Sequence, residues 1–137
     1  MNYWLIKSEP GAWSWEDHMK KGVEHWDGVR NHQANNKIKA LKLGDKAFFY
    51  HSVNEKRIVG IVEVVSGHYP DHTDESGRFG MVNFKALETV PNPVTLADIK
   101  ADERLSAMVL VKNSRLSVQP VTVEEWSIVC AMAGVDP

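Results

Sequence analysis

The chain has almost no cysteine and no long apolar segment. Cys130 is the single cysteine among 137 residues, which excludes an internal disulfide and agrees with a reducing compartment. No run of about 18 apolar residues is present, so no membrane-spanning helix is expected. Residues 1–5 also lack the charged-then-apolar order of a secretory signal. We therefore expect a cytoplasmic protein that does not enter a membrane.

The chain also lacks a marked excess of positive or negative charge. Sixteen Lys and Arg against 18 Asp and Glu give a net charge of −2, which argues against a protein that coats nucleic acid by bulk electrostatics. The distribution is uneven, because residues 28–44 contain no acid but four cations, Arg30, Lys37, Lys39 and Lys42. This stretch leaves room for a local basic face, on which the three lysines would contact a nucleic-acid backbone.

Signatures of catalysis and metal binding are missing. The chain has no GxSxG, HExxH, P-loop or dinucleotide-binding glycine pattern. His68 and His72 stand four apart, with Asp71 and Asp74 nearby, but Pro70 between them disrupts the helix that usually brings such a pair together. We interpret this stretch as a solvated loop and expect no metal ion and no cofactor.

Tryptophan, by contrast, is abundant. Five tryptophans stand at positions 4, 13, 15, 26 and 126, four of them within the first 26 residues. Such a concentration either lines a ligand-binding surface or fills a small core with large rings, and the sequence leaves both interpretations open. With 43% hydrophobic residues, no repeat and no linker, residues 1–137 are expected to fold as a single domain.

Apolar patterning predicts several strands joined by short helices. Strands are expected over residues 3–7, 45–52, 57–65, 81–90 and 116–120. The short link between the second and third predicts an antiparallel hairpin. On the third, strict alternation places Ile58, Val62 and Val64 on one face and Val59, Ile61 and Val65 on the other. Residues 69–77 are expected to form a polar loop.

Capping residues predict the helices. Ser14 begins a helix that ends at Gly22, Thr95 begins a short helix, and Thr122 begins a last helix whose apolar stripe includes Cys130 as a core residue. A further helix of about twelve residues is expected from Asn31, ended by a glycine at position 44. Residues 105–111 fit a helix or a strand equally. These elements predict an α+β fold, a small curved mixed sheet or barrel flanked by short helices.

The segment Trp26–Asn31 (WDGVRN) carries the most specific chemistry. A stacking ring, a flexible glycine, a permanent cation and a two-way hydrogen-bonding amide stand within six residues, which suits a planar ligand with a patterned edge such as a nucleobase. Two further polar clusters, at residues 7–10 and 50–52, each follow an apolar strand. They either present ligand-binding groups or are satisfied by the local backbone. Residues 115–120 fit a structural edge strand better than a ligand-binding segment.

These segments together resemble the EVE domain of the PUA-like superfamily over nearly the full chain, and a bacterial member is the natural expectation. The matching stretches, in family order, are YWLIKSEP at residues 3–10, WDGVRN at 26–31, GD at 44–45 with FYHS at 49–52, VGI at 59–61 with EV at 63–64, YPD at 69–71, PVTL at 93–96 and RLSVQPV at 115–121.

The resemblance implies a PUA-like pseudo-barrel of about five to six strands that recognises a modified base, notably a 5-modified cytosine in DNA, with RNA as an alternative. By the same resemblance, the ligand-binding residues are Trp26 as the stacking wall, Asn31, Ser8 and Ser52 as hydrogen-bonding groups, Arg30 and Lys7 at phosphate or behind the pocket, and Val29 and His51 along it. The expected partner is nucleic acid, bound by a monomer.

The chain departs from the family pattern just after this motif. Where the family commonly reads RNYQARN, residues 30–36 read RNHQANN, so His32 replaces a tyrosine and Asn35 replaces an arginine. Two other functions are also compatible with the sequence. One is an enzyme acting on nucleic acid or a nucleotide, with His51 and Glu9 as acid and base. The other is a protein-interaction domain that uses its tryptophans as a docking surface.

Overall fold

The computed structural model describes residues 2–25, 39–53, 55–67, 69–70, 80–113 and 116–137. The strands are β1 (Tyr3–Ser8), β2 (Val23–His25), β3 (Lys46–His51), β4 (Arg57–Val64), β5 (Tyr69–Pro70), β6 (Gly80–Met81), β7 (Asn83–Thr95) and β8 (Val118–Val121). The helices are α1 (Trp15–Lys21), α3 (Leu96–Ala101), α4 (Val109–Lys112) and α5 (Val123–Ala133), with a 3-10 helix η1 (Glu103–Leu105).

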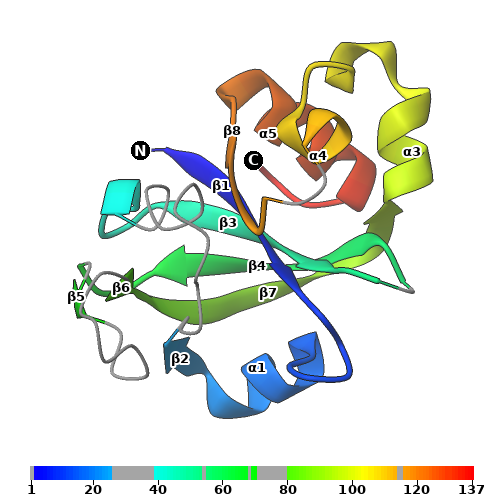
Figure 1. Cartoon of the computed structure of the whole chain (residues 1–137). Helices are drawn as coiled ribbons and strands as arrows, with labels where there is room; N and C mark the ends of the chain where they lie inside the picture. The colour runs from blue at the N-terminus through cyan, green and yellow to red at the C-terminus, as the bar shows by residue number, and fades with distance from the viewer. Residues whose placement is uncertain (1, 26–38, 54, 68, 71–79, 114–115) are drawn as a thin grey trace.

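Six strands form one mixed sheet in the order β2-β7-β4-β3-β1-β8. β1 and β3 run parallel, and every other neighbouring pair in this sheet is antiparallel. The sheet curves between α1 on one side and α3, α4 and α5 on the other, while β5 and β6 form a separate small ribbon (Figure 1). The predicted α+β architecture, a mixed half-barrel of six strands with short helices, is confirmed.

Apolar side chains fill both faces of this sheet. We call the cluster that includes Ile6, Trp15 and Phe49 the α1-side core. The cluster that includes Phe48 and Trp126 is the α5-side core. Successive residues of β3 alternate between the two cores, as the period of a strand requires. Strands that bury both faces explain why the sequence shows continuous apolar runs at these positions.

β4 departs from the alternation predicted for it. Ile58 and Ile61 pack in the α5-side core, whereas Val59, Val62 and Val64 pack in the α1-side core. The prediction that Ile58 shares a face with Val62 and Val64 is therefore wrong. The cause is a set of register shifts, between Ile58 and Gly60 and between Ile61 and Val62. At the first shift the extra residue is Val59, which reverses the facing of the β4 residues that follow. At the second shift the extra residue is Leu87, on β7.

β7 is longer than predicted and continues past two prolines to Thr95. Its pairing with β4 passes from Thr89 directly to Val94, so Pro91 and Pro93 lie in an unpaired stretch. Proline has no backbone N–H, and a stretch without ladder bonds tolerates it. β8 likewise continues through Pro120 by one residue because it is an edge strand.

The three helix starts predicted from capping residues are confirmed. Ser14, Thr95 and Thr122 each cap a helix through a complete capping box. Residues 103–105 and 109–112 are helical, which resolves the ambiguity at 105–111. On α5, burial raises the pKa of the Cys130 thiol to about 11, in agreement with a core residue.

Two other predictions need correction. The helix expected from Asn31 to residue 44 lies largely outside the described residues, and its described end is helical only at Lys39 and Ala40. Gly44 instead adopts a φ of +91° in the turn that enters β3, a conformation that favours glycine. Tyr69, expected in a loop, pairs with Met81, because β5 and β6 form a short ribbon.

The tryptophans that the structure describes serve mainly the core. Trp4, Trp15 and Trp126 are almost fully buried, while Trp13 is half-buried against the α1-side core. None of the helices formed by the described residues combines the length and apolar character that crossing a bilayer requires.

Candidate functional site

The carboxyl ends of β1 and β3 meet at one edge of the sheet, because these two strands are parallel. Ser8, the last residue of β1, pairs with His51, the last residue of β3. The contact continues one residue further, since the backbone N–H of Ser52 donates to the carbonyl of Ser8 over 2.9 Å. The structure therefore brings together three of the predicted ligand-binding residues.

Lys7 does not share a face with Ser8 and His51. Its register partner is Tyr50, whose ring belongs to the α5-side core, and the ammonium Nζ of Lys7 lies 5.7 Å from the centre of that ring. Burial lowers the pKa of Lys7 and raises the pKa of Tyr50. Alternation along the strand thus separates two predicted ligand-binding residues and directs Lys7 and Ser8 to opposite sides of the sheet.

His51 is held through both ring nitrogens. Its Nε2 accepts a hydrogen bond of 2.9 Å from the backbone N–H of Trp15, and its Nδ1 lies 2.9 Å from Oε1 of Glu55. These partners select the neutral tautomer with the proton on Nδ1, because a backbone N–H can only donate. The bond to His51 also lowers the pKa of Glu55. In this arrangement the lone pair needed for the acid-base role with Glu9 is already in use.

The bond to His51 has a second effect, because Trp15 is the first residue of α1. The first N–H groups of a helix have no partner within the helix. Ser14 caps one of them by accepting from the N–H of Asp17, and His51 caps another. The end of β3 therefore fixes where α1 begins.

A chain of hydrogen bonds extends from Ser8 into the α1-side core. The Ser8 hydroxyl donates to the carbonyl of Trp13, and the indole Nε1 of Trp13 donates to Nδ1 of His18 over 3.0 Å. Nε2 of His18 lies 2.9 Å from the carbonyl oxygen of Phe84 on β7. His18 also stacks on Trp15, with ring centres 6.2 Å apart and 7° between the planes. Rings and hydrogen bonds of the α1-side core thus support the sheet edge where β1 and β3 end.

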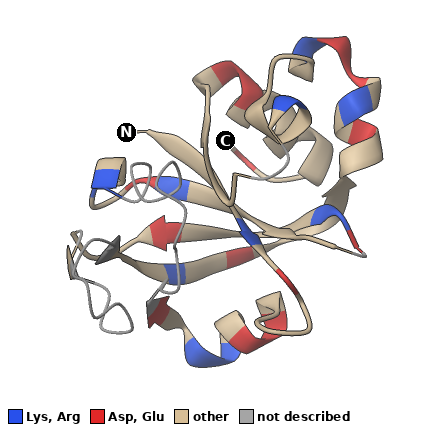
Figure 2. Ribbon diagram, viewed as in Figure 1, with Lys and Arg blue, Asp and Glu red and all other residues tan. Residues whose placement is uncertain are grey.

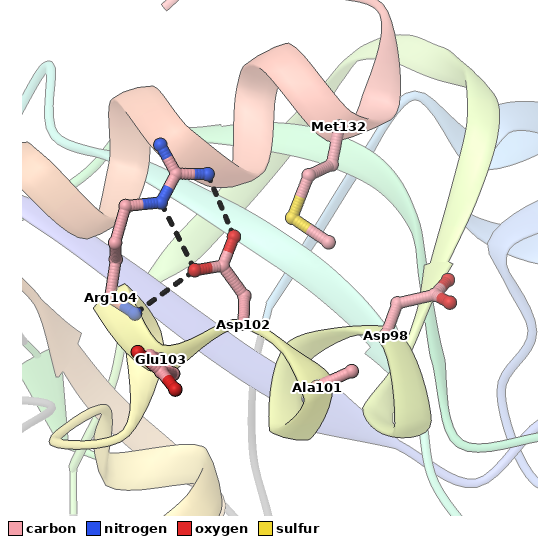
Figure 3. Close-up of a pocket in the computed structure, with 6 residues that line it drawn as sticks. All are labelled: Asp98, Ala101, Asp102, Glu103, Arg104 and Met132. Atoms are coloured by element: carbon pink, nitrogen blue, oxygen red, sulfur yellow. Dashed lines mark hydrogen bonds and ion pairs between the residues drawn. The ribbon is translucent and has the colours of Figure 1, made fainter.

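A surface hollow of about 470 Å³ lies elsewhere, beside α3, η1 and α5 (Figure 3). It is lined by Asp98, Ala101, Asp102, Glu103, Arg104 and Met132. The guanidinium of Arg104 forks onto Asp102, with Nη2–Oδ2 at 2.7 Å and Nε–Oδ1 at 3.0 Å, and this pairing lowers the pKa of Asp102. Three carboxylates against one paired cation disfavour phosphate, so nucleic acid is not expected to bind here.

Comparison with known protein families shows which family the chain belongs to. The profile of the EVE domain matches residues 2–132. The chain belongs to the EVE domain family. Human thymocyte nuclear protein 1 is 33% identical over 99% of this chain and 76% of that protein, and the mouse protein of the same name is 32% identical over 99% and 75%. The predicted family membership is confirmed.

Solved structures extend this kinship to the fold. An NMR structure of a Rhodopseudomonas palustris protein is 54% identical, with a TM-score of 0.94 over 98% of this chain and 94% of that one. A crystal structure of the human protein THYN1 in complex with DNA containing 5-methylcytosine is 35% identical, with a TM-score of 0.90 over 100% of both chains.

Much of the predicted ligand-binding set of this EVE domain lies outside the described residues. Trp26, Val29, Arg30, Asn31 and Lys37 belong to residues 26–38, which the structure does not describe, so their roles stay predictions. The other two predicted backbone contacts, at positions 39 and 42, are exposed just before β3. Over the described chain, basic and acidic residues are interspersed (Figure 2).

Sequence reasoning missed three residues that organise the site, Trp13, His18 and Glu55. Each makes contacts with residues that are distant in the chain or follow from a loop conformation, and none belongs to a motif that we used. One signal was available for His18: it stands three residues after Trp15 on α1, which places the two side chains on one face of the helix.

Stability is expected to fall as the pH drops below about 6.5, because His18 is buried as a neutral imidazole. Burial lowers the pKa of His18 in the folded state, so the unfolded chain takes up the proton first. The contribution of His18 is therefore complete above the unfolded pKa and is lost as the pH falls toward the folded pKa. The slope is at most about 1.4 kcal/mol per pH unit.

Urea unfolding at pH 7.5, 6.5 and 5.5 measures this dependence, with His18→Gln as the variant that cannot titrate. The informative quantity is the difference in slope between the two proteins, because that difference isolates the contribution of position 18. We expect a flatter profile for His18→Gln. Identical slopes would assign the pH dependence to other groups.

Proposed function

We propose that this EVE domain reads a modified base in nucleic acid, and that 5-methylcytosine in DNA is the first ligand to test. The observation that carries the proposal is the similarity, over the whole of both chains, to the human protein THYN1, whose crystal structure is a complex with DNA containing 5-methylcytosine. The two chains are 35% identical, so the ligand of the human protein is a reasonable first ligand to propose for this chain.

In this proposal the ends of β1 and β3 form a rigid, buried support for the pocket. Ser8 and His51 bring a hydroxyl and an imidazole to the same face, and their internal hydrogen bonds hold them in fixed positions. A fixed polar edge lowers the cost of ordering groups on binding. Trp13 adjoins them through its backbone, whose carbonyl accepts from the Ser8 hydroxyl, and its indole is half-buried.

Trp26 and Asn31 complete the proposed pocket. The base stacks on Trp26, while Asn31, Ser8 and Ser52 bond its edge. Extruding a base from a duplex costs a few kcal/mol, and stacking on an aromatic ring returns about 1–3 kcal/mol. Because these terms nearly cancel, hydrogen bonds in the pocket must supply the discrimination between bases.

The remaining predicted residues supply position and charge in this proposal. Arg30 and Lys7 contact phosphate or support the pocket from behind, and Val29 lies along it. Lys37, Lys39 and Lys42 contact the nucleic-acid backbone. Because the net charge is −2, these contacts are local, and affinity depends on few phosphates.

The decisive experiment is binding of the Trp26→Ala variant to matched oligonucleotides at fixed salt. The set contains DNA and RNA of one sequence, each with cytosine or 5-methylcytosine at one position. We expect wild type to prefer a modified strand and the variant to lose about 10–100-fold in affinity for it, the value of one stacked base. If Trp26→Ala binds modified DNA and RNA as tightly as wild type, the pocket assignment is wrong.

Two controls separate base reading from general effects. Trp126→Phe changes a ring of the α5-side core and should leave the preference for the modified base unchanged. Lys39→Ala combined with Lys42→Ala should weaken all nucleic acids together, and reduce the salt slope on duplex DNA by about 1.8. Tighter binding of modified RNA than of modified DNA would support recognition of a modified base but change the proposed substrate from DNA to RNA.

A further inference from the structure

The connection between β3 and β4 holds a valine in an unfavourable conformation. Val53 has a φ of +69°, in the left-handed region where a β-branched side chain clashes with its own backbone. Its side chain is nevertheless 54% exposed, so burial in the core does not compensate this cost. Glycine or asparagine would adopt the same backbone with less strain.

Among the described residues of this connection, Glu55 and Lys56 are held by hydrogen bonds. Oε1 of Glu55 lies 2.9 Å from Nδ1 of His51 and 3.1 Å from Nε of Arg57. The carbonyl of Lys56, whose φ is also positive at +48°, accepts a hydrogen bond of 2.8 Å from the N–H of Leu96. Glu55 and Lys56 are therefore anchored to His51 and Leu96 a few residues after the exposed valine.

The position of Val53 relates it to the proposed reading site. It directly follows Ser52, whose N–H bonds to Ser8 at the edge where β1 and β3 end. Exposed Lys56 belongs to the same connection, and exposed Arg57 is the first residue of β4. The connection extends beyond the ends of the strands at the margin of the molecule (Figures 1 and 2). An exposed apolar group with cations nearby is suited to a duplex, whose phosphates flank an apolar base stack.

We propose that Val53 is a wedge that enters the base stack of a duplex next to the base being read. Apolar side chains inserted between base steps open the stack, and the unstacking they promote favours extrusion of a base. The strain at Val53 then has a reason, because only a side chain with carbon bulk can fill the gap. This inference rests on the proposed function and adds that the natural target is a duplex.

The test compares duplex and single-stranded DNA, because only a duplex has a paired stack to open. Val53→Asn removes the apolar bulk and suits a positive φ, and Val53→Ile keeps the branched bulk. Val123→Asn is the matched control, since Val123 is another exposed valine, 64% exposed, at the start of α5. The probe is a 14-base-pair duplex with one central 5-methylcytosine, and its modified strand alone.

We expect Val53→Asn to bind the duplex about tenfold more weakly than wild type, with less than about a twofold change on the single strand. The same variant should raise the Tm by about 3–5 °C, because the strain is relieved. Val53→Ile and Val123→Asn should bind both probes like wild type. A more stable protein that binds its duplex less well is not the result of a folding defect.

The outcomes separate the wedge from the proposed function. If wild type binds the duplex and Val53→Asn binds it equally well, the wedge is overturned and the reader stands. Equal losses on duplex and single strand also overturn it, since they assign Val53 to a general contact. If wild type binds neither DNA nor RNA with any preference for the modified base, the proposed function itself fails.

Discussion

Replacing Gly60 with alanine is expected to destabilise the protein by about 3 kcal/mol, a large share of the total stability of a domain. A Cβ at position 60 would lie 2.4 Å from two ring carbons of Trp15 and 2.6 Å from a third. These distances are well inside van der Waals contact. Glycine at this point of β4 is what allows an indole to lie flat against the strand.

The ring has little room to yield. Trp15 is 2% exposed, its Nε1 donates to the hydroxyl of Thr89 over 2.9 Å, and its centre lies 5.1 Å from that of Phe49. Its backbone N–H is bound to His51, so a shift of the ring also strains the edge where Ser8 lies. We therefore expect Gly60→Ala to weaken ligand binding as well as folding.

Urea unfolding of Gly60→Ala measures the effect, with Gly67→Ala as its matched control. A Cβ at Gly67 meets nothing within 4 Å, so that variant should lie within about 0.5 kcal/mol of wild type. Adding Trp15→Leu should recover part of the loss, since the smaller side chain frees the space, and a double-mutant cycle gives the coupling. A loss below 1 kcal/mol for Gly60→Ala would show that the indole repacks easily.

Replacing Asp45 with alanine is expected to cost about 3–5 kcal/mol, because its buried carboxylate joins the N-terminal segment to the turn before β3. Oδ1 accepts from the N–H of Asn2 at 3.1 Å, and Oδ2 accepts from Nε1 of Trp4 at 3.0 Å and from the N–H of Lys42 at 3.0 Å. Hydrogen bonds to a charged group contribute about 1.5–3 kcal/mol each, and alanine would leave the buried indole N–H of Trp4 unpaired.

Thermal and urea unfolding of two Asp45 variants test this prediction. Asp45→Asn keeps the shape but turns one acceptor into a donor, so it should lie between wild type and Asp45→Ala. Asp136→Ala removes an exposed carboxylate near the C-terminus and should be almost neutral. If Asp45→Ala and Asp136→Ala unfold alike, the carboxylate at position 45 is not a structural link.

Helix starts could be predicted because their physics is local. Ser14, Thr95 and Thr122 bond to backbone groups three residues away, so a short window of sequence holds all the information. The faces of β3 were also predictable, because nothing interrupts the alternation of its residues between the two cores.

The pairing of the strands was harder to predict from the sequence. The bulges of β4 follow from how three strands fit side by side, and a single strand pattern carries no trace of them. The same holds for the site edge: Ser8 and His51 stand 43 residues apart in the sequence and are neighbours only because β1 and β3 pair in parallel. The sequence did identify both as candidates, since each ends an apolar strand.

By itself, the sequence determined the family, the mixed α+β class and the helix caps, because these depend on short motifs and on periodicity. Through its resemblance to the family it also named the candidate binding residues, whose roles stay predictions. Only the tertiary structure decided which candidates share a face, and it separated Lys7 from Ser8 and His51. It also decided that Gly60 accommodates Trp15. Contacts of this kind depend on the three-dimensional meeting of distant segments, where a difference of one residue in register reverses every side chain.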